Sequence, residues 1–345
     1  MILVTGGAGY IGSHTCVELL NRDHDIVVLD NLCNSNSESV NRVKKLTGKH
    51  FDFIEGDIRN RELLDRIFKC YPVTAVLHFA GLKSVSESVD MPLSYYDNNI
   101  EGTLVLCKAM ANAGINNLVF SSSATVYGTP ESLPIRESMP LSSTTPYGRS
   151  KLIVEQILKD MADAPDSEWS IIALRYFNPV GAHPSGMIGE DPKEIPNNLM
   201  PYITQTAIGK RSILHVFGDN YDTCDGTGVR DYIHVVDLAV GHVRAIEKLN
   251  RSTSPLGTLP LNLGTGYGVS VLELVKAFEQ ENGVKVPFDV QARRTGDVSA
   301  CYADASKAQQ ELNWCATKGI REMVKDSWNW QQNNPEGYQV SELRN

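Results

Sequence analysis

The first half of the chain alternates short apolar runs with longer segments of helical spacing, and few folds accommodate this alternation. The apolar runs are Ile2–Val4, Ile26–Leu29, Phe51–Ile54, Val73–Phe79, Asn117–Ser121 and Ile171–Arg175. Segments such as Arg61–Cys70 and Tyr147–Met161 separate them, with apolar residues at helical spacing. Strands that are apolar throughout and are separated by helices form parallel βαβ units with both sheet faces covered. We therefore expect an α/β fold with a doubly wound parallel sheet.

The character of the chain changes after residue 177. Residues 178–198 and 217–230 are rich in Gly, Pro, Asn and Asp, which is typical of long loops. A chain of 345 residues has room for about two domains. We predict a first domain over 1–177 and a smaller mixed α/β domain over 178–345. The segment from about 232 to 266 is expected to return to the first domain.

Composition excludes several classes of partner. The chain has 32 Lys+Arg against 41 Asp+Glu, a formal net charge of −9, which disfavours nucleic acid and anionic membranes as partners. No apolar run approaches the roughly 18 residues of a membrane span. The seven cysteines are scattered and form no CxxC pair, so we expect reduced thiols and a cytoplasmic location. No histidine cluster has ligand spacing, so no metal site is expected.

A glycine-rich turn follows the first apolar run directly and opens a helical pattern. Gly6, Gly9 and Gly12 have the spacing of a dinucleotide-binding fingerprint, in which the glycines allow a tight turn and a close approach to a pyrophosphate. The second apolar run ends at Asp30, whose carboxylate can accept both ribose hydroxyls and would repel a 2′-phosphate. These features predict a Rossmann-type domain that binds NAD rather than NADP. Asp57, after the third run, is a candidate for the adenine end.

A second pattern indicates acid–base chemistry. Thr145 and Pro146 form a plausible helix start, so Tyr147 and Lys151 fall one turn apart on the face that continues into an apolar stripe. A cation near a phenol favours the phenolate and would lower a pKa that is about 10 when unperturbed. Ser123 stands at a strand's carboxyl end, where it can bind the same substrate oxygen. We predict Tyr147, Ser123 and Lys151 as catalytic residues.

Several longer motifs carry a resemblance to a known family. The chain contains Gly6-Gly-Ala-Gly-Tyr-Ile-Gly-Ser-His, Ser121-Ser-Ser-Ala-Thr-Val-Tyr-Gly, Leu174-Arg-Tyr-Phe-Asn-Pro-Val-Gly-Ala-His and Val229-Arg-Asp-Tyr-Ile-His-Val-Val-Asp. Together with Tyr147-x-x-x-Lys151 they resemble the extended short-chain dehydrogenase/reductase superfamily and, within it, the UDP-galactose 4-epimerases. The resemblance runs from residue 1 to about Tyr338. It implies an NAD-dependent isomerase that interconverts UDP-glucose and UDP-galactose through a 4-keto intermediate, and a homodimer.

The resemblance also implies residue roles. On the cofactor side it adds residues of the turn, the strand ends and the neighbouring loops: Tyr10, Ile11, Asn31, Asn34, Ser35, Ile58, Phe79, Ala80, Gly81, Lys83, Asn98, Ser121 and Phe177. On the UDP-sugar side, beside Ser123 and Tyr147, it adds residues of the second half: Asn178, Asn198, Leu199, Phe217, Arg230, Tyr232, Arg294, Asp297 and Cys301.

Two of these positions keep alternative interpretations. Planar guanidinium groups suit a diphosphate, so Arg230 and Arg294 are the candidate cations, although Arg230 and Asp231 could form a surface ion pair. Cys301 stands where galactose-restricted members carry a bulky tyrosine, and a cysteine there would admit an N-acetyl group. Activity on UDP-GlcNAc and UDP-GalNAc is therefore expected too. A one-residue shift would put Tyr302 there instead, and Cys301 could also be a simple core residue.

Rival functions can be separated by residue chemistry. A sugar-nucleotide 4,6-dehydratase needs an Asp-Glu pair after the strand-end hydroxyl, where this chain has Ala124 and Thr125. A strict UDP-GlcNAc 4-epimerase and a simple NAD-dependent reductase remain compatible with the spacing. A non-catalytic NAD-binding sensor would need neither Tyr147 with Lys151 nor two arginines for a diphosphate.

Overall fold

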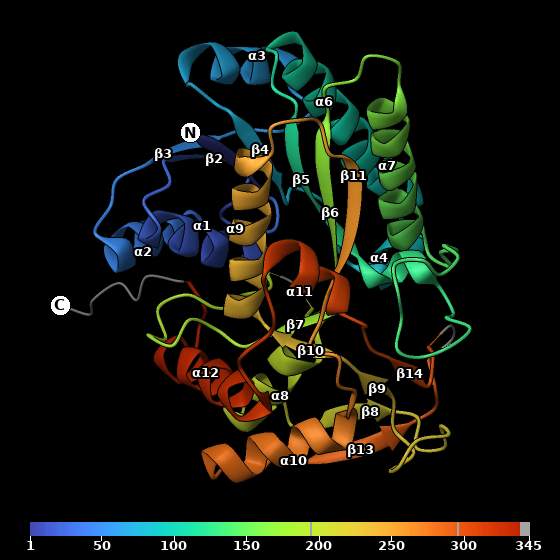
Figure 1. Cartoon of the computed structure of the whole chain (residues 1–345). Coiled ribbons are helices and arrows are strands. Elements are labelled where there is room, and N and C mark those ends of the chain that lie inside the picture. Colours follow the sequence, from blue (N-terminus) through green and yellow to red (C-terminus); the bar gives the residue numbers. More distant parts are fainter. Residues whose placement is uncertain (194, 295–296, 339–345) are drawn as a thin grey trace, which may run out of the picture.

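One parallel sheet organises the N-terminal half of the computed structural model, which describes residues 1–193, 195–294 and 297–338 (Figure 1). Its strands are β1 Ile2–Thr5, β2 Ile26–Asp30, β3 Asp52–Glu55, β4 Ala75–His78, β5 Asn117–Ser123, β6 Ser170–Tyr176 and β11 Gly257–Leu263. Their order is β11-β6-β5-β4-β1-β2-β3, and every neighbouring pair is parallel. The predicted doubly wound parallel sheet is confirmed.

Helices cover both faces of this sheet because alternate strand residues point to opposite sides. The helices around it are α1 Tyr10–Asn21, α2 Ser37–Thr47, α3 Arg61–Cys70, α6 Gly102–Asn112, α7 Pro146–Asp163 and α9 Val235–Arg251. Ile2 and Val4 belong to the core cluster that holds residues of α1, α2 and α9. Leu3, between them, belongs to the cluster that holds residues of α3, α6 and α7.

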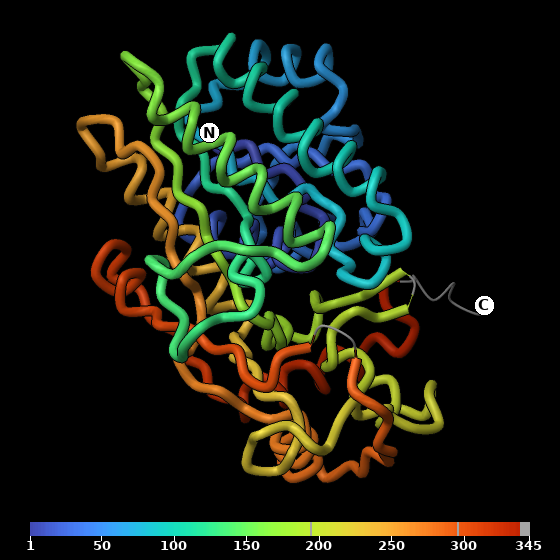
Figure 2. The backbone as a smooth tube through the Cα atoms, turned by 90° about the vertical axis from the view of Figure 1, so that its right-hand side faces the viewer, coloured from blue at the N-terminus to red at the C-terminus, as the bar shows by residue number. Residues whose placement is uncertain are grey.

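The second half forms a separate lobe of short strands and helices, drawn mostly in yellow to red below the sheet in Figure 2. Its short sheets pair β7 Asn178–Val180 with β10 Tyr232–His234, β8 Leu214–Phe217 with β13 Phe288–Gln291, and β9 Val229–Arg230 with both β12 Val269–Ser270 and β14 Ala300–Cys301. Its helices are α8 Leu199–Ala207, α10 Val271–Asn282 and α12 Ile320–Asn333, whereas α11 Ser306–Leu312 packs against β11 and α9. Residues of α8, α10 and α12 share one core cluster.

Short helical turns complete the described chain. They are α4 Val85–Asp90, α5 Pro92–Tyr96, a π-helical turn Asp97–Glu101 that leads into α6, and a 3₁₀ turn Ala124–Tyr127 after β5. Helix α10 begins with a capping box between Ser270 and Glu273 and ends at Gly283 in the left-handed conformation. Helices α2, α8, α9 and α12 are not among the predicted segments.

The segment 232–266 contributes to both halves. Strand β11 pairs with β6 along its whole length, and α9 packs against α1, whereas β10 pairs with β7 in the second lobe. A domain boundary at residue 177 stays a prediction. The chain that follows residue 177 includes segments that line the candidate site, at 178–179 and 189–192.

Candidate active site at the carboxyl edge of the sheet

A cavity of about 300 Å³ lies where β1, β2, β4, β5 and β6 end. Open α/β sheets bind ligands outside the carboxyl ends of their strands, because loops and helix N-termini converge there. The cavity is lined by most of the predicted cofactor residues: Gly6, Gly9, Tyr10, Ile11, Gly12, Asp30, Asn31, Asn34, Ser35, Ile58, Phe79, Ala80, Gly81, Lys83, Asn98, Ser121, Tyr147, Lys151 and Phe177. It also reaches Ser123, Asn178 and Asn198 from the predicted substrate set.

The glycine turn brings backbone atoms closer together than a side chain would allow. Gly6 has φ of +71°, and a β-carbon there would lie 2.6 Å from the Ala80 nitrogen. A β-carbon on Gly12 would lie 2.3 Å from the Gly6 oxygen. Gly9 caps α1 without a side-chain hydrogen bond, and the first turn of α1 carries no acidic residue. The N-terminal amides and dipole of α1 are therefore free for an anion such as a pyrophosphate.

Asp30 ends β2 with its carboxylate at the cavity wall. One oxygen accepts from the amide of Leu32 at 2.9 Å and from Ser35 Oγ at 2.8 Å, and the other from the amide of Ala8 at 3.0 Å. A carboxylate has about four acceptor sites, so these bonds leave part of one oxygen for a ribose hydroxyl. The same bonds fix the carboxylate in place before any ligand arrives.

Asp57 does not line the cavity. Its carboxylate accepts from Asn31 Nδ2 at 3.0 Å and from Arg59 Nη2 at 2.8 Å. The hydrogen bond from Arg59 is the main cause that lowers the pKa of Asp57 to about 2. Its observed contacts therefore hold Asn31, which does line the cavity.

Tyr147, Ser123 and Lys151 meet at the inner end of the cavity. Thr145 caps α7 by accepting from the Gly148 amide at 3.3 Å, and Pro146 occupies the first helical position, as the sequence predicted. Lys151, on the same buried face of α7, donates from Nζ to the Ser121 carbonyl at 2.8 Å. Its ammonium lies 5.0 Å from the centre of the Phe120 ring. This places a cation and a phenol at one end of the dinucleotide cavity.

The expected lowering of the Tyr147 pKa by Lys151 is wrong. Burial raises the pKa of Tyr147, and the opposing influence is a hydrogen bond with Ser123. Burial also lowers the pKa of Lys151 to about 8. The reason is that both side chains are buried, which disfavours their charged forms, and that the Lys151 ammonium donates to the Ser121 carbonyl.

The substrate side is built differently from the cofactor side. Arg230, Arg294, Asp297, Phe217, Leu199, Tyr232 and Cys301 do not line the described cavity. The guanidinium of Arg294 lies 3.9 Å from the centre of the Phe217 ring. Arg230 donates to the Val298 carbonyl at 2.9 Å and contacts Asp297 at 3.4 Å. Tyr232 is buried, and Leu199 packs against the same core cluster of the second lobe.

Asp231 is buried, so the alternative of a surface ion pair with Arg230 is wrong. Its carboxylate accepts from the amides of Thr265 at 2.8 Å, Gly266 at 3.0 Å and Ala303 at 3.1 Å. Its own amide donates to the Cys301 carbonyl at 3.0 Å. One carboxylate thus ties together three segments around Arg230.

Cys301 and Tyr302 point to opposite sides of β14. Cys301 packs against a cluster that contains Phe177, a residue of the cavity wall, and Ala303 belongs to the same cluster. Tyr302 lies on the other side, where a β-carbon on Gly268 would come within 3.1 Å of its ring. Of the two side chains, Cys301 is therefore the one that packs on the side of Phe177.

Residues 181–193 run from the second lobe along the cavity, and 189–192 line it. The Tyr10 hydroxyl donates to the Gly181 carbonyl at 2.6 Å. Glu190 contacts Lys83 Nζ at 3.3 Å and accepts from Asn198 Nδ2 at 2.7 Å with the same oxygen. This segment therefore joins the glycine turn, a cofactor loop and a predicted substrate residue.

Sequence reasoning missed several residues of the wall, among them Tyr176, Glu190 and Tyr338. Tyr176 directly precedes Phe177, so its motif offered a signal. Glu190 and Tyr338 are brought in by long-range contacts, and no local pattern marks them.

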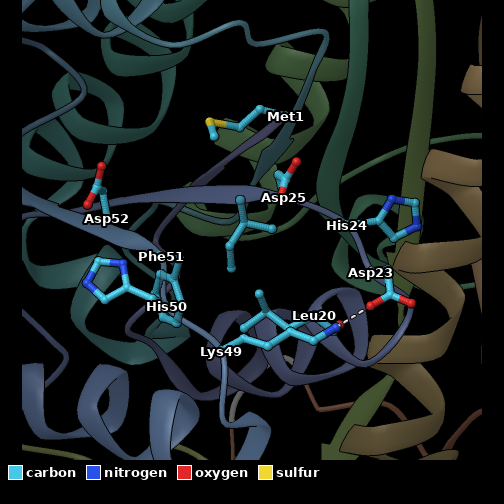
Figure 3. Close-up of a pocket in the computed structure, with 10 residues that line it drawn as sticks. Met1, Leu20, Asp23, His24, Asp25, Lys49, His50, Phe51 and Asp52 are labelled. Carbon is cyan, nitrogen blue, oxygen red and sulfur yellow. Dashed lines mark hydrogen bonds and ion pairs between the residues drawn. The ribbon is translucent and has the colours of Figure 1, made fainter.

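A second cavity, of about 600 Å³, lies at the opposite, amino edge of the sheet and includes Met1, Asp25, Phe51 and Asp52 (Figure 3). Lys49 reaches across it to Asp23 at 2.5 Å. It lies away from the helix N-termini that favour phosphates and from Tyr147. We assign it no role in the chemistry.

The described residues contain neither a metal-binding cluster nor a membrane-spanning helix. Within 1–193, 195–294 and 297–338, no group of three or more His, Cys, Asp or Glu side chains could hold a metal ion. In the same ranges, no helix combines the length and the apolar character that crossing a bilayer requires. All seven cysteines are free thiols.

Comparison with known proteins gives consistent matches over nearly the whole chain. The family model described as GDP-mannose 4,6 dehydratase matches residues 3–327. A UDP-glucose 4-epimerase of Bacillus subtilis is 60% identical over 341 residues, which cover 99% of each chain.

Solved structures give the same result. The UDP-glucose-4-epimerase of Stenotrophomonas maltophila, with bound NAD and formylated UDP-arabinopyranose, is 51% identical with a TM-score of 0.94, covering 97% of this chain and 98% of that one. The enzyme of Bifidobacterium longum, in complex with NAD+ and UDP, is 52% identical with a TM-score of 0.93, covering 97% and 99%.

Proposed function

Because the chain belongs to the UDP-glucose 4-epimerase family, we propose that it interconverts UDP-glucose and UDP-galactose through a 4-keto sugar, with NAD as a resident cofactor. The observation that carries this proposal is the meeting of Tyr147, Ser123 and Lys151 in the cavity that the glycine turn opens. Acid–base groups and a dinucleotide cradle then share one enclosed space.

The cavity fits the cofactor. The crowded backbone at Gly6 and Gly12, the free N-terminus of α1 and the fixed carboxylate of Asp30 suit a pyrophosphate and a ribose. When bound, NAD would supply the hydride acceptor at the sugar's C4 and, after the keto sugar has turned over, the hydride donor to its other face.

The protein's own residues handle the proton. Ser123 Oγ accepts from the amide of Thr125 at 3.2 Å and from its hydroxyl at 3.0 Å, which leaves the Ser123 proton free to donate. That proton can bind the sugar 4-oxygen or the phenolate of Tyr147. Tyr147 takes the proton of the 4-hydroxyl as a general base and returns it in the second half of the cycle. The Lys151 ammonium stabilises the negative charge during the transfer.

A direct assay tests this function. Purified protein is incubated with UDP-galactose without added NAD, and UDP-glucose is measured. We expect conversion in both directions and a constant amount of bound NAD, because each cycle regenerates it. A protein that holds NAD but converts neither sugar would refute the proposal and favour a binding module.

A 4,6-dehydratase is the nearest alternative, since the matching family model carries that description. That reaction needs carboxyl groups beside the strand-end hydroxyl to protonate a leaving group and remove a C5 proton. Here the 3₁₀ turn presents Ala124 and Thr125, and Thr125 is hydrogen-bonded to Ser123. These residues support the epimerase instead.

We further propose that Arg230 and Arg294 bind the diphosphate of the UDP-sugar. An acidic chain needs local cations for this ligand, and both guanidinium groups are already oriented, Arg230 by the Val298 carbonyl and Arg294 by the Phe217 ring. Stacking on Phe217 leaves the edge of the Arg294 guanidinium for bidentate bonds with phosphate oxygens.

The proposal extends to N-acetylated sugars. Cys301 faces the cluster beside Phe177, and a cysteine leaves more room there than a tyrosine would. We expect the enzyme to interconvert UDP-GlcNAc and UDP-GalNAc as well. Cys301→Tyr should reduce that activity at least about tenfold and spare UDP-galactose, because only the N-acetyl group needs the space.

A matched variant separates volume from position in this test. Tyr302→Phe, on the opposite side of β14, should leave the ratio of the two activities unchanged. Wild-type protein that converts UDP-galactose but leaves UDP-GlcNAc untouched would refute the extension without affecting the 4-epimerase proposal.

A homodimer remains part of the proposal. The side chains of Val89, Met91 and Leu93 are more than half exposed, and they lie on or beside α4 and α5, which pack next to α7. Such an apolar patch suits a second copy of the chain. Sedimentation of the protein should give twice the monomer mass. The Leu93→Asp variant should give a lower mass. A cytoplasmic location also stays a prediction.

A further inference from the structure

A buried ion pair lies directly behind the catalytic residues without touching the cavity. Glu155 on α7 and Arg175 on β6 have side chains that are only 7% and 4% exposed. Arg175 donates from Nε to both carboxylate oxygens, at 3.0 and 3.2 Å, and from Nη2 at 2.5 Å. Burying two charges costs so much solvation that a well-packed apolar pair often gives equal or greater stability. Stability alone is therefore a weak reason for this pair.

The contacts of the pair lead to the strand end that carries Ser123. The Ser122 hydroxyl donates to Glu155, and Arg175 lies opposite Ser122 in the parallel register of β5 and β6. Ser122 is the residue between Ser121, whose carbonyl holds Lys151, and Ser123. The pair thus holds the strand end from behind, on the side opposite the cavity.

A second branch leads to the turn after Ser123. Arg175 Nη1 donates to the Tyr127 hydroxyl at 2.9 Å, which itself donates to Asn262 Oδ1 at 2.7 Å. Tyr127 ends the 3₁₀ turn that begins beside Ser123. A single guanidinium therefore connects α7, β6 and the turn that orients Thr125 toward Ser123.

The carboxylate also acts on Lys151, one helical turn earlier on the buried face of α7. The charge of Glu155 raises the pKa of Lys151 and opposes the lowering by burial. The titratable groups nearby include Tyr147 on α7, Tyr176 on β6 and His78 on β4. Burial raises the pKa of both tyrosines and lowers that of His78 to about 3, so all three are neutral. Glu155 is thus the negative charge that favours the ammonium form.

We propose that the Glu155–Arg175 pair is a positioning device that aligns Ser123 and Lys151 for proton transfer. This inference rests on the proposed epimerase function. Glu155 and Arg175 touch neither the cavity nor the expected ligands, so they are positioning residues, and their effect should fall on turnover rather than on binding.

The decisive variant replaces the network by apolar groups of similar volume, namely Ser122→Ala, Glu155→Leu and Arg175→Met together. Tyr127 keeps its bond to Asn262, so the variant leaves no charge unpaired. We expect a melting temperature and an NAD content close to those of the parent, KM within about threefold, and kcat lowered at least about tenfold. The alkaline limb of the rate should move to lower pH, because Lys151 would lose its proton more readily.

Two further variants keep the test decisive. Lys159→Ala with Asp163→Ala removes an exposed ion pair from the same helix and should leave kcat and the pH profile unchanged. Arg175→Lys keeps the buried charge but loses the fork that binds Glu155 and Tyr127 together. It should lower kcat while the alkaline limb stays at the parental pH.

The outcomes separate this inference from the proposed function. A parent protein that converts no UDP-sugar refutes the function. An active parent whose triple variant keeps its kcat and pH profile refutes the positioning role. If the triple variant does not fold, Arg175→Lys decides: parental kcat in that variant would refute the inference, and a lowered kcat with unchanged KM would support it.

Discussion

The cofactor side and the substrate side of the candidate site are built in two different ways. The cofactor side consists of consecutive strand ends of one sheet, so the backbone register of β1, β2, β4 and β5 fixes it. The substrate side rests on strands of two to four residues that are tied by side chains, with Asp231 at their centre. We therefore expect substitutions on the substrate side to change binding of the UDP-sugar while binding of NAD is retained.

The largest effect is expected where the two sides meet. Tyr147→Phe keeps the ring but removes the group that exchanges the proton, so kcat should fall about 10³-fold. NAD content should stay that of the parent, because the phenol is one contact among many in the cavity. Tyr71→Phe, which removes an exposed hydroxyl bonded to Asp52, is the control. Full turnover in Tyr147→Phe would remove Tyr147 from the mechanism.

Acid should weaken the cofactor side first. His14, His78 and His242 are buried in α1, β4 and α9, and burial lowers their pKa values to about 3, 3 and 4. Each unfolded histidine has a pKa near 6.5, so these groups stabilise the fold above that pH and lose this contribution as pH falls. The free energy of unfolding should drop by up to about 4 kcal/mol per pH unit below 6.5.

Denaturant titrations at pH 7.5, 6 and 5, with the amount of retained NAD as a second probe, measure this effect. A stability that stays flat down to pH 5 would show that the three rings are not neutral in the fold.

The two sides also differ in how far the sequence predicts them. The glycine turn, Asp30 and the Tyr147–Lys151 helix face follow from local spacing, because strand, turn and helix are consecutive in the chain. Tyr338 and Glu190 enter the cavity through contacts between segments far apart in sequence, which no local pattern encodes. The direction of the Tyr147 pKa shift is wrong in the sequence prediction because spacing reveals a charged neighbour but not the burial of the phenol.

Asp231 offers a way to break the substrate side alone. Asp231→Asn turns an amide NH₂ group toward backbone N–H donors that need an acceptor. This should lower the free energy of unfolding by about 2 kcal/mol. We expect weaker UDP binding by calorimetry with unchanged NAD content. Asp219→Asn, exposed in the same lobe, provides the control. Loss of NAD together with UDP would show that the two sides are not separable.

The smallest expected effect tests the diphosphate cations. Arg294→Ala should raise KM for UDP-galactose at least about tenfold with kcat nearly unchanged, because the bond is made in both ground and transition states. Its neighbour Arg293 stacks on Tyr221 instead of Phe217, so Arg293→Ala is a matched control. Equal effects of the two substitutions would point to general charge rather than to a phosphate contact.

The segment 181–193 bears on what happens when a bound cofactor is left reduced. Residues of it line the cavity, and it contacts Lys83 and Tyr10 on the cofactor side, which favours retention of a bound dinucleotide. A keto sugar that escaped in mid-cycle would leave its two electrons on the retained cofactor. A fresh UDP-sugar could not be oxidised by that reduced cofactor, so the molecule would be inactive. A preparation of this protein should therefore contain active molecules and molecules whose cofactor is left reduced. An oxidant, rather than more NAD, should restore the activity of an aged sample.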